Sequence, residues 1–514
     1  MYPYQPQPPY GQPYYVPPAP TPAQLERRAL RKQGNFAGAI MLAITAGSRL
    51  TFTVLVYILL FAGVLTPDRL QDDLLGFTRT QYLLIYAGVY TFAMLVPALL
   101  VALIGGRRQF PLSPAKRVNA GDAFFGVLAA MGICMAANII SNIVSSFFED
   151  MGASVPEMPD MLEHTPQGLL LYIFTIAVLP ALIEELLFRG YVMQALRTHG
   201  DWFAVTVSAL LFGLMHGNVE QIPFAFIVGL ALGWLLVMTD NIWLCVAVHF
   251  ANNAVSCLSE YLTAGMSDAA VGAFSAVIVY GIAAIGLIAL AVLAARRSEL
   301  FRSLPRKSLL TGGERMGTLL TAPVFLIGVL IMIALTVVDA VTLALSDERY
   351  MRCALALAAE AAGEGEVPVG AVIVRDADGT VIGRGRNRRE RARNALSHAE
   401  LEAIDEACRT LGGWRLFGCT LYVTLEPCPM CAGAIINARI GRVVFGTADP
   451  KAGSCGSLVD LFALPYNHRP QLCSGVLADE CRDQLTWFFR QLRARPRQAQ
   501  AGPDVTTQGG ENDE

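Results

Sequence analysis

Four residues in the C-terminal third of the chain have the types and spacing of a metal-dependent hydrolytic site: His398, Glu400, Cys428 and Cys431. One imidazole and two thiolates suit a tetrahedral zinc ion that keeps its fourth position open. Zinc held in this way lowers the pKa of a water molecule and supplies a nucleophile at neutral pH. The sequence therefore predicts His398, Cys428 and Cys431 as zinc ligands. Glu400, two residues after the histidine, can face the same water as a proton shuttle.

Two simpler interpretations compete with the zinc centre. A C-x-x-C pair in an intracellular protein can be a redox pair, and a lone His-x-Glu can lie on the surface of a helix. Both patterns occur here together and in order, however. The joint pattern H-x-E…P-C-x-x-C is typical of zinc nucleobase deaminases.

The local sequence predicts the elements that hold these side chains. Residues 419–425 are rich in β-branched and aromatic side chains and predict a strand that leads to Cys428. A helix is expected to begin near Pro429, where its dipole favours thiolate over thiol. Another helix should begin at His398, with Ser397 as its N-cap. Together with the neighbouring elements, these predict an α/β/α sandwich: a helix at 348–362, strands near 369–375, 381–386 and 442–446, and a helix at 478–493.

The chain as a whole is too apolar for a soluble protein, and the excess lies in one part of it. Of its 514 residues, 54% are hydrophobic and 16% charged, and this length predicts more than one domain. Long apolar runs fill residues 36–345, whereas residues 346–495 have an ordinary α/β composition. The net charge of −3 averages these two parts. The eleven cysteines form no secreted disulfide pattern, which favours a reducing compartment.

The sequence thus predicts a multidomain fold, with an all-α polytopic membrane bundle before the α/β/α domain. We expect a membrane domain of eight helices at 36–300, then a basic loop and a ninth apolar segment at 301–345. Tails at 1–35, rich in Pro, Tyr and Gln, and at 496–514 are expected to be disordered. The nine apolar segments lie near 37–64, 82–105, 121–146, 167–197, 202–217, 222–239, 241–258, 269–295 and 317–338.

Basic residues concentrate in alternate loops of the predicted bundle. They precede the first segment, lie between the second and third, and follow the eighth: Arg27, Arg28, Arg31, Lys32, Arg107, Arg108, Lys116, Arg117, Arg296, Arg297, Arg302, Arg306, Lys307 and Arg315. The intervening loops are acidic or weakly basic. The positive-inside rule therefore predicts a multi-pass protein of the cell membrane with a cytoplasmic N-terminus.

Ionisable residues within the predicted membrane helices mark a second candidate site, because such residues are costly in a bilayer. At about 1.5 Å per residue, they fall at similar depths and can meet near the middle of the membrane. There they could activate a water directly or through a metal. The alternative is a buried polar network that only fixes helix packing. The residues are Glu184, Glu185, Arg189, His216, His249 and Asn253.

The motifs that contain these residues, E-E-x-x-x-R, F-x-x-x-H and H-x-x-x-N, resemble those of the CPBP family of intramembrane proteases. That family includes the type II CAAX prenyl endopeptidases and bacteriocin-immunity relatives, and the resemblance covers about residues 36–300. It implies an intramembrane endopeptidase, without identifying its substrate or its metal. It also implies catalytic roles for Glu184, Glu185, His216 and His249, with Arg189 and Asn253 as supporting motif positions.

Residues 346–495 resemble the bacterial tRNA-specific adenosine deaminases over essentially the whole length of that family. The matching stretches include E-V-P-V-G-A-V-I-V from Glu366 and L-Y-V-T-L-E-P-C-P-M-C-A-G-A from Leu421. The resemblance implies a cytidine-deaminase-like fold with one zinc ion per domain. It implies a homodimer with its interface near 428–446. It also implies conversion of adenosine to inosine at the wobble position of a tRNA, specifically an arginine tRNA.

The same resemblance implies a set of RNA contacts around a base extruded from the single-stranded anticodon loop. Asn387 resembles the family residue that contacts this base. The arginine-rich run 384–393 offers phosphate contacts, or is a merely solvated loop. Ala448 stands where a basic residue is common in the family, so one phosphate contact is absent there. The loops that align with RNA-contacting loops hold Asp449, Lys451, Asn467, His468 and Arg469.

Three hypotheses for the whole chain follow. The first is a tRNA adenosine deaminase joined to a CPBP-type membrane domain. The second is chiefly a membrane protease or immunity protein with an incidental or mis-joined deaminase, and the third makes the membrane half an inactive anchor. Both sets of motifs are intact, which favours two competent active sites. The expected partners are then a tRNA for the deaminase and a lipid bilayer for the helical bundle.

The position of the deaminase relative to the membrane raises a conflict. We expect the deaminase domain to lie in the cytoplasm, because its expected tRNA substrate is found there. A ninth crossing at 317–338 would instead place it outside, and residues 339–346 are short and apolar for a linker. Either the ninth segment does not fully cross, or two neighbouring genes have been joined.

Overall fold

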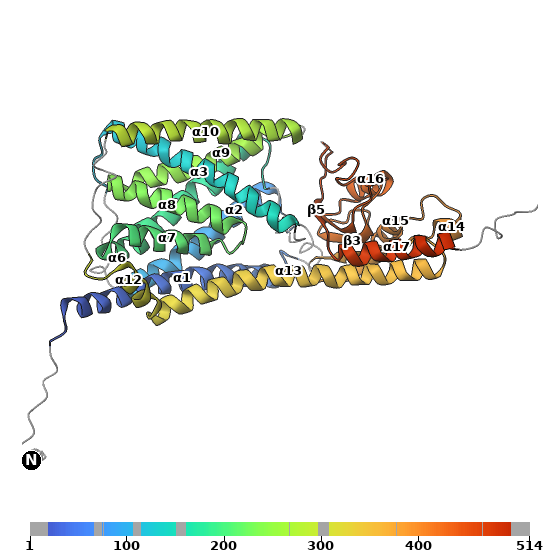
Figure 1. The fold of residues 1–514 in the computed structure, drawn as a ribbon, viewed down its shortest axis with the longest axis horizontal. Coiled ribbons are helices and arrows are strands. Elements are labelled where there is room, and N and C mark those ends of the chain that lie inside the picture. Colours follow the sequence, from blue (N-terminus) through green and yellow to red (C-terminus); the bar gives the residue numbers. More distant parts are fainter. Residues whose placement is uncertain are drawn as a thin grey trace, which may run out of the picture.

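The computed structural model describes residues 19–65, 74–75, 77–105, 115–150, 161–266, 268–296, 308–376, 378–464 and 466–494. A bundle of apolar helices is followed by a domain built on a five-stranded mixed sheet, and one long helix belongs to both (Figure 1). This arrangement confirms the expected multidomain fold. The calls on the outermost tails, residues 1–18 and 495–514, and on Arg107, Arg108, Arg297, Arg302, Arg306 and Lys307 lie outside the described residues.

Within the described ranges, seven helical stretches are long and apolar enough to cross a membrane, and a bent pair could form an eighth. The pair is α12 (Gly312–Leu320) and the start of α13 (Pro323–Gly363), which meet at 81°. The other helices of the bundle are α1 (Pro22–Phe61), α2 (Arg79–Gly105), α3 (Ala120–Asp150), α4 (Pro166–Ile173), α5 (Leu179–Glu185), α6 (Met193–Leu196), α7 (Asp201–Met215), α8 (Gln221–Thr239), α9 (Ile242–Thr263) and α10 (Asp268–Arg296).

The expectation of eight full spans before residue 300 differs from the structure at α7. This helix has 15 residues, which rise about 22 Å and fall short of a hydrocarbon core of about 30 Å. Arg197 pairs with Asp201 at the start of α7 and with Asp240 at the end of α8, each at 2.8 Å. Helices α7 and α8 therefore form a hairpin whose two ends lie at the same end of the bundle.

The expected disordered tail at 1–35 is wrong from Pro22 onward, where α1 already begins. Thr21 caps this helix, because its hydroxyl accepts from the Gln24 main chain while the Gln24 side chain accepts from Thr21 N. Proline at the first helical position needs no donor there. Leu30 is fully buried, so the added turns of α1 belong to the bundle core.

Helix α13 begins at the end of the bundle that holds Arg27 and Lys116, here called the basic end, and leaves the bundle at the opposite end. Arg27 near the start of α1 pairs with Glu314 of α12, and a Cβ on Gly38 would lie 2.5 Å from Phe325 Cα. Gly38 also faces Gly328, so the two helices pack closely through small residues and run in the same direction. The second half of α13 then continues beneath the sheet domain (Figure 1).

The sheet has the order β2-β1-β3-β4-β5. Strand β1 pairs antiparallel with β2 and β3, whereas β3, β4 and β5 run parallel. Side chains alternate between two cores: Ile373 packs toward α15 and α16, and Val372 packs toward α13. This confirms the α/β/α sandwich. The elements are β1 (Gly370–Arg375), β2 (Thr380–Arg386), α14 (Arg389–Ala392), α15 (Ala399–Leu411), β3 (Cys419–Leu425), α16 (Pro429–Ala438), β4 (Arg442–Thr447), β5 (Gln471–Ser474) and α17 (Ala478–Ala494).

Two details of this domain differ from expectation. Strand β5 was not expected, because it has only four residues and they show no clear alternation of apolar and polar side chains. The N-cap of α15 is His398, whose backbone is extended and whose side chain makes no capping hydrogen bond, rather than Ser397. The imidazole of His398 is therefore free of a capping role at the start of the helix.

A close approach between β2 and α15 fixes the helix that carries Glu400. A Cβ on Gly385 would lie 1.9 Å from the Ala399 carbonyl oxygen and 2.6 Å from Ala403 N. The missing side chain at this position therefore sets the spacing between strand and helix, because a backbone cannot yield as a flexible side chain does.

Replacing Gly385 with alanine should lower the free energy of unfolding of the segment 346–495 by about 1–3 kcal/mol, since α15 must move away from β2. Urea unfolding followed by tryptophan fluorescence measures the change. The matched control is Gly413→Ala, which has open space around it and should change stability by less than about 0.5 kcal/mol. Equal stabilities for the two variants would contradict this account of the packing.

Candidate functional site

The expected zinc ligands come together where two helices begin at one edge of the sheet. Strand β3 ends at Leu425, and Cys428 then serves as the N-cap of α16, with Pro429 at its first position. His398 occupies the equivalent place at the start of α15. Because β3 and both helix starts share this edge, residues about thirty positions apart in sequence become neighbours.

The geometry of the three side chains suits a metal ion. The ligand atoms of His398, Cys428 and Cys431 all lie within 4.8 Å of one another, with Nδ1 of the histidine 3.7 Å and 3.5 Å from the two sulfurs. One nitrogen and two sulfurs form a donor set that zinc accepts, with one position open. Among the residues that the structure describes, no other group of His, Cys, Asp or Glu gathers three ligand atoms this closely.

The contacts among these ligands shift their pKa values in opposite directions. A hydrogen bond from Cys431, with further support from His398, lowers the pKa of Cys428 to about 4 although burial opposes the change. The hydrogen bond to Cys428, together with burial, raises the pKa of Cys431. Metal binding must release the protons that these ligands still carry, so the affinity of the site for a metal depends on pH.

Glu400 is buried beside the ligands, with 4% of its surface exposed. Burial raises the pKa of this carboxyl group above its ordinary value, although a main-chain hydrogen bond and His398 act in the opposite direction. A carboxyl group with a raised pKa can accept and return a proton near neutral pH. This property fits the proton shuttle expected from the sequence.

The expected RNA contacts fall into two groups. Asp449 and Lys451 follow the end of β4, at the edge that holds the zinc ligands. Asn467 and His468 precede β5 at the other edge, where they bond Arg439 at 2.6 Å and the Ile440 carbonyl at 2.7 Å. With about 3.3 Å per strand residue, the two groups lie roughly 20 Å apart. Exposed Arg469 belongs to the second group, and buried Asn387, just after β2, to the first.

The arginine-rich run is largely engaged by carboxylates of its own domain. Arg386 and Arg391 both pair with Glu364, at 2.9 and 3.0 Å. Arg388 lies 3.9 Å from Glu402. These surface pairs are weak, so the arginines could exchange them for phosphates, but the run is not a set of unpaired cations.

Two buried carboxylates beside the zinc ligands, Glu366 and Glu426, were missed by the sequence analysis. Glu426 is 2% exposed and Glu366 1%. Glu426 directly follows β3, and Glu366 lies four residues before the start of β1. An acidic residue this close to an apolar strand is the signal that could have identified them.

In the bundle, the helix with the E-E-x-x-x-R motif is irregular. Five residues at Phe174–Val178 and seven at Leu186–Val192 form π-helical turns on either side of α5. Such turns are frequent at functional sites, because they redirect side chains. Here they flank Glu184 and Glu185, which the sequence analysis singled out.

Glu185 is the centre of a fully buried ionic group. Its Oε1 accepts from Arg189 at 3.0 Å and from His249 Nδ1 at 2.9 Å. Arg189 also donates to the Gly229 carbonyl and lies over the Phe212 ring, 4.6 Å from its centre. This pairing offsets part of the cost of burying three ionisable groups, while Glu185 Oε2 has no hydrogen-bond partner among the described residues. Part of the motif therefore has a structural role.

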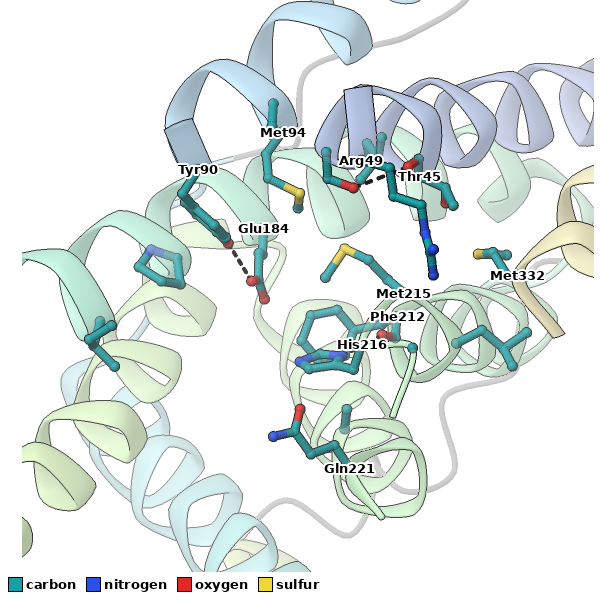
Figure 2. Close-up of a pocket in the computed structure, with 18 of the residues that line it drawn as sticks. Thr45, Arg49, Tyr90, Met94, Glu184, Phe212, Met215, His216, Gln221 and Met332 are labelled. Carbon is teal, nitrogen blue, oxygen red and sulfur yellow. Dashed lines mark hydrogen bonds between the residues drawn. The ribbon is translucent and has the colours of Figure 1, made fainter. Parts of the chain in front are cut away.

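Glu184 faces a cavity of about 760 Å³ (Figure 2). Its Oε1 accepts a hydrogen bond of 2.5 Å from Tyr90, and its Oε2 lies 3.8 Å from His249 Nε2. His216 lines the same cavity and bonds the Phe212 carbonyl. The structure therefore brings Glu184, His216 and His249 to one cavity, together with Asn253, which donates to the Ile176 carbonyl at 3.1 Å.

Two further features of the cavity were missed by the sequence analysis. Tyr90 and Arg49 both line it (Figure 2), and the single charge of Arg49 within an apolar run was the available signal for the second. Met332 and Thr336 of α13 form part of the wall. The helix that continues into the sheet domain therefore also bounds the membrane site.

Comparisons with known proteins agree with this division of the chain. Residues 345–493 match the family described as MafB19-like deaminase, and residues 166–255 match the family described as type II CAAX prenyl endopeptidase Rce1-like. A tRNA-specific adenosine deaminase of Bacillus subtilis is 50% identical over 154 residues, which are 30% of this chain and 94% of that protein. That of Haemophilus influenzae is 47% identical over 148 residues, 29% of this chain and 85% of the relative.

Among solved structures, one from a study of A-to-I editing by tRNA:A34 deaminases at the wobble position of transfer RNA is 44% identical. It covers 26% of this chain and 98% of its own, with a TM-score of 0.26. Because half of the aligned residues are identical over nearly all of the Bacillus subtilis protein, the chain belongs, through residues 345–493, to the family of tRNA-specific adenosine deaminases, here joined to an Rce1-like CAAX protease domain at residues 166–255.

Proposed function

We propose that residues 346–495 convert adenosine to inosine at the wobble position of a tRNA, with an arginine tRNA as the substrate. The observation that carries this proposal is the meeting of His398, Cys428 and Cys431 beside buried Glu400. The relatives named tRNA-specific adenosine deaminases support the choice of substrate.

The reaction replaces the amino group at adenine C6 by oxygen, so the water must give up both of its protons, one to the base ring and one to the amine that departs as ammonia. A zinc ion, when bound by the three ligands, would supply the polarisation that makes this water a nucleophile. Glu400 takes the proton from the water and delivers it to the base, which its raised pKa allows near neutral pH. Asn387, held at the same edge of the sheet, is the proposed contact to the base.

A homodimer through the deaminase domain follows from the same proposal. Asp449 and Lys451 lie at the zinc edge, whereas Asn467 and Arg469 lie at the opposite edge. A second copy that packs near 428–446 brings another set of these residues next to the first zinc centre. One anticodon loop can then contact both groups of residues.

For the membrane domain we propose an intramembrane endopeptidase. Glu184 and His249 approach each other at 3.8 Å in the cavity, with His216 nearby, and such groups can activate a water for hydrolysis. Glu185 has a second role, since its bonds to Arg189 and His249 hold the histidine in place. The Rce1-like match supports this class of reaction.

We further propose that the deaminase is cytoplasmic, because tRNA is found there. The structure sharpens the conflict with the basic loops, since α13 leaves the bundle at the end opposite to Arg27 and Lys116. Two arrangements give a cytoplasmic deaminase. Either the basic end of the bundle faces outward, or residues from about 346 onward are made as a separate polypeptide.

Replacing Glu400 with alanine should lower turnover on a tRNA anticodon stem-loop by about 10²–10⁴-fold, because the proton shuttle is lost. Zinc content, measured by atomic emission, should stay at one per domain. Cys428→Ala should lose zinc and stability together. Glu480→Ala, at an exposed carboxylate, is the control and should retain zinc and activity; full activity in the Glu400 variant would refute the mechanism.

Cysteines placed at 184 and 249 should become cross-linked by a short bifunctional thiol reagent in membranes, because the longer native side chains meet at 3.8 Å. A pair at 184 and 199 is the control and should not, since about fifteen helical residues separate them by roughly 22 Å. His249→Ala should abolish cleavage of a quenched peptide library while the helices still insert. Failure of the first pair to cross-link would contradict a shared site.

A reporter fused after Arg495 should behave as cytoplasmic in intact cells. An antibody to the deaminase domain then separates the two arrangements. A membrane band at 55.5 kDa indicates one chain whose basic end faces outward. A soluble band below about 20 kDa, at roughly 110 Da per residue, indicates a separate polypeptide. A reporter signal from outside the cell would refute the tRNA substrate.

A further inference from the structure

Two buried glutamates, Glu366 and Glu426, flank the zinc ligands at the same edge of the sheet. Glu366 precedes β1, and Glu426 directly follows β3. Strands β1 and β3 are antiparallel neighbours, with Ala371 opposite Val423. The start of one strand therefore lies beside the end of the other, and the two carboxylates approach the zinc edge from adjacent strands.

Glu426 holds the loop that follows β4. Its Oε2 accepts from Asp449 N at 3.0 Å, and its Oε1 accepts from Cys455 N at 2.9 Å and from Ser457 N at 3.1 Å. The Ser457 hydroxyl also donates to Oε2. Both oxygens are thus occupied by donors from 449–457, the loop that contains the proposed RNA contact Lys451.

Glu366 does the same for the loop that follows β2. Its Oε1 accepts from Arg391 N at 2.6 Å, and its Oε2 accepts from Glu390 N at 3.2 Å. The Asn387 amide lies 3.4 Å from the same Oε2. The carboxylate therefore fixes both the proposed base contact and the first turn of α14, within the arginine-rich run.

Neither carboxylate is used as an ordinary ion pair. In the described part of the chain, no lysine or arginine side chain forms an ion pair with Glu366 or Glu426. A hydrogen bond from a main-chain N–H to a carboxylate is stronger than one between neutral groups. Several such bonds to one carboxylate fix the path of the main chain through a loop. Loops that lack regular structure need such partners to keep one conformation.

We infer that Glu366 and Glu426 are positioning residues that hold the two loops beside the zinc ligands in the shape that receives RNA. This inference rests on the proposed function, because it assigns the loops to that substrate. Glutamine at either position keeps the volume but turns an NH₂ group toward main-chain N–H donors. The loop must then move, while His398, Cys428, Cys431 and Glu400 keep their places.

Hydrogen–deuterium exchange on the full-length zinc protein in detergent tests the loops directly. In Glu426→Gln, the main-chain amides of Asp449, Cys455 and Ser457 should exchange about tenfold faster or more, because the acceptor that they share loses its charge. In Glu366→Gln, the change should be confined to 387–393. Glu480→Gln, at an exposed carboxylate paired with Arg352, should leave both loops unchanged.

Kinetics on an anticodon stem-loop RNA separate positioning from simple loss of structure. Both glutamine variants should keep one zinc per domain and raise KM about tenfold. Their kcat should stay within about threefold of the wild type, because the reacting groups are untouched. If Glu426→Gln loses zinc, the variant Ser457→Ala tests the same role, because it removes one hydrogen-bond donor to Glu426 and leaves the buried carboxylate in place. This variant should speed amide exchange at 455–457 and raise KM.

Unchanged exchange in the loops would refute the inference, as would a fall in kcat at constant KM. Failure of the proposed function gives a different result. A wild-type protein that binds the RNA without deaminating it refutes the reaction alone. The exchange rates and the RNA affinity, measured by fluorescence anisotropy, then still decide whether the two glutamates position the loops: weaker binding with faster exchange supports the role, and unchanged values contradict it.

Discussion

The need to satisfy carboxylates that are removed from water determines both sites of this protein. A buried carboxylate is paired or hydrogen-bonded, or burial raises its pKa, and the chain shows all three solutions. Glu185 is paired with Arg189 and His249, Glu426 is surrounded by main-chain donors, and Glu400 has a raised pKa. Each solution gives a different consequence: a fixed histidine, a fixed loop and a group that carries protons.

The meeting of His398, Cys428 and Cys431 could be predicted from the sequence because each part of the motif is short and local. Two thiols three residues apart, at the start of a helix, already define half of a tetrahedral site, and a single imidazole supplies the third protein ligand. The roles of Glu366 and Glu426 could not be predicted in this way. Their partners are main-chain groups up to 31 residues away, and a main-chain donor leaves no mark on the sequence. The same limit applies to the short β5, whose pairing with β4 supplies what its own residues do not.

In the bundle, hydropathy located the helices well but not their ends or their shapes. Hydropathy does not detect a capping box, so the predicted start of α1 lies too far along the chain. It also does not distinguish the short α7 from a helix that spans the membrane. The π-helical turns beside Glu184 were also invisible to it, because they change the hydrogen-bond pattern without changing composition. The convergence of Glu184, His216 and His249 was nevertheless predictable, since polar groups in an apolar helix have few places to go except toward each other.

Helix α13 gives the joined chain a physical meaning that two domains on a flexible linker would lack. Its first half packs on α1 through Gly38 and Gly328 and lines the membrane cavity with Met332. Its second half anchors the sheet domain, where Asp347 binds Arg442 at 2.7 Å and accepts from Tyr422 at 2.8 Å. A continuous helix transmits rotation and tilt that a coil would absorb. One helix therefore forms part of the cavity wall and part of the core of the sheet domain, so the same element positions both sites.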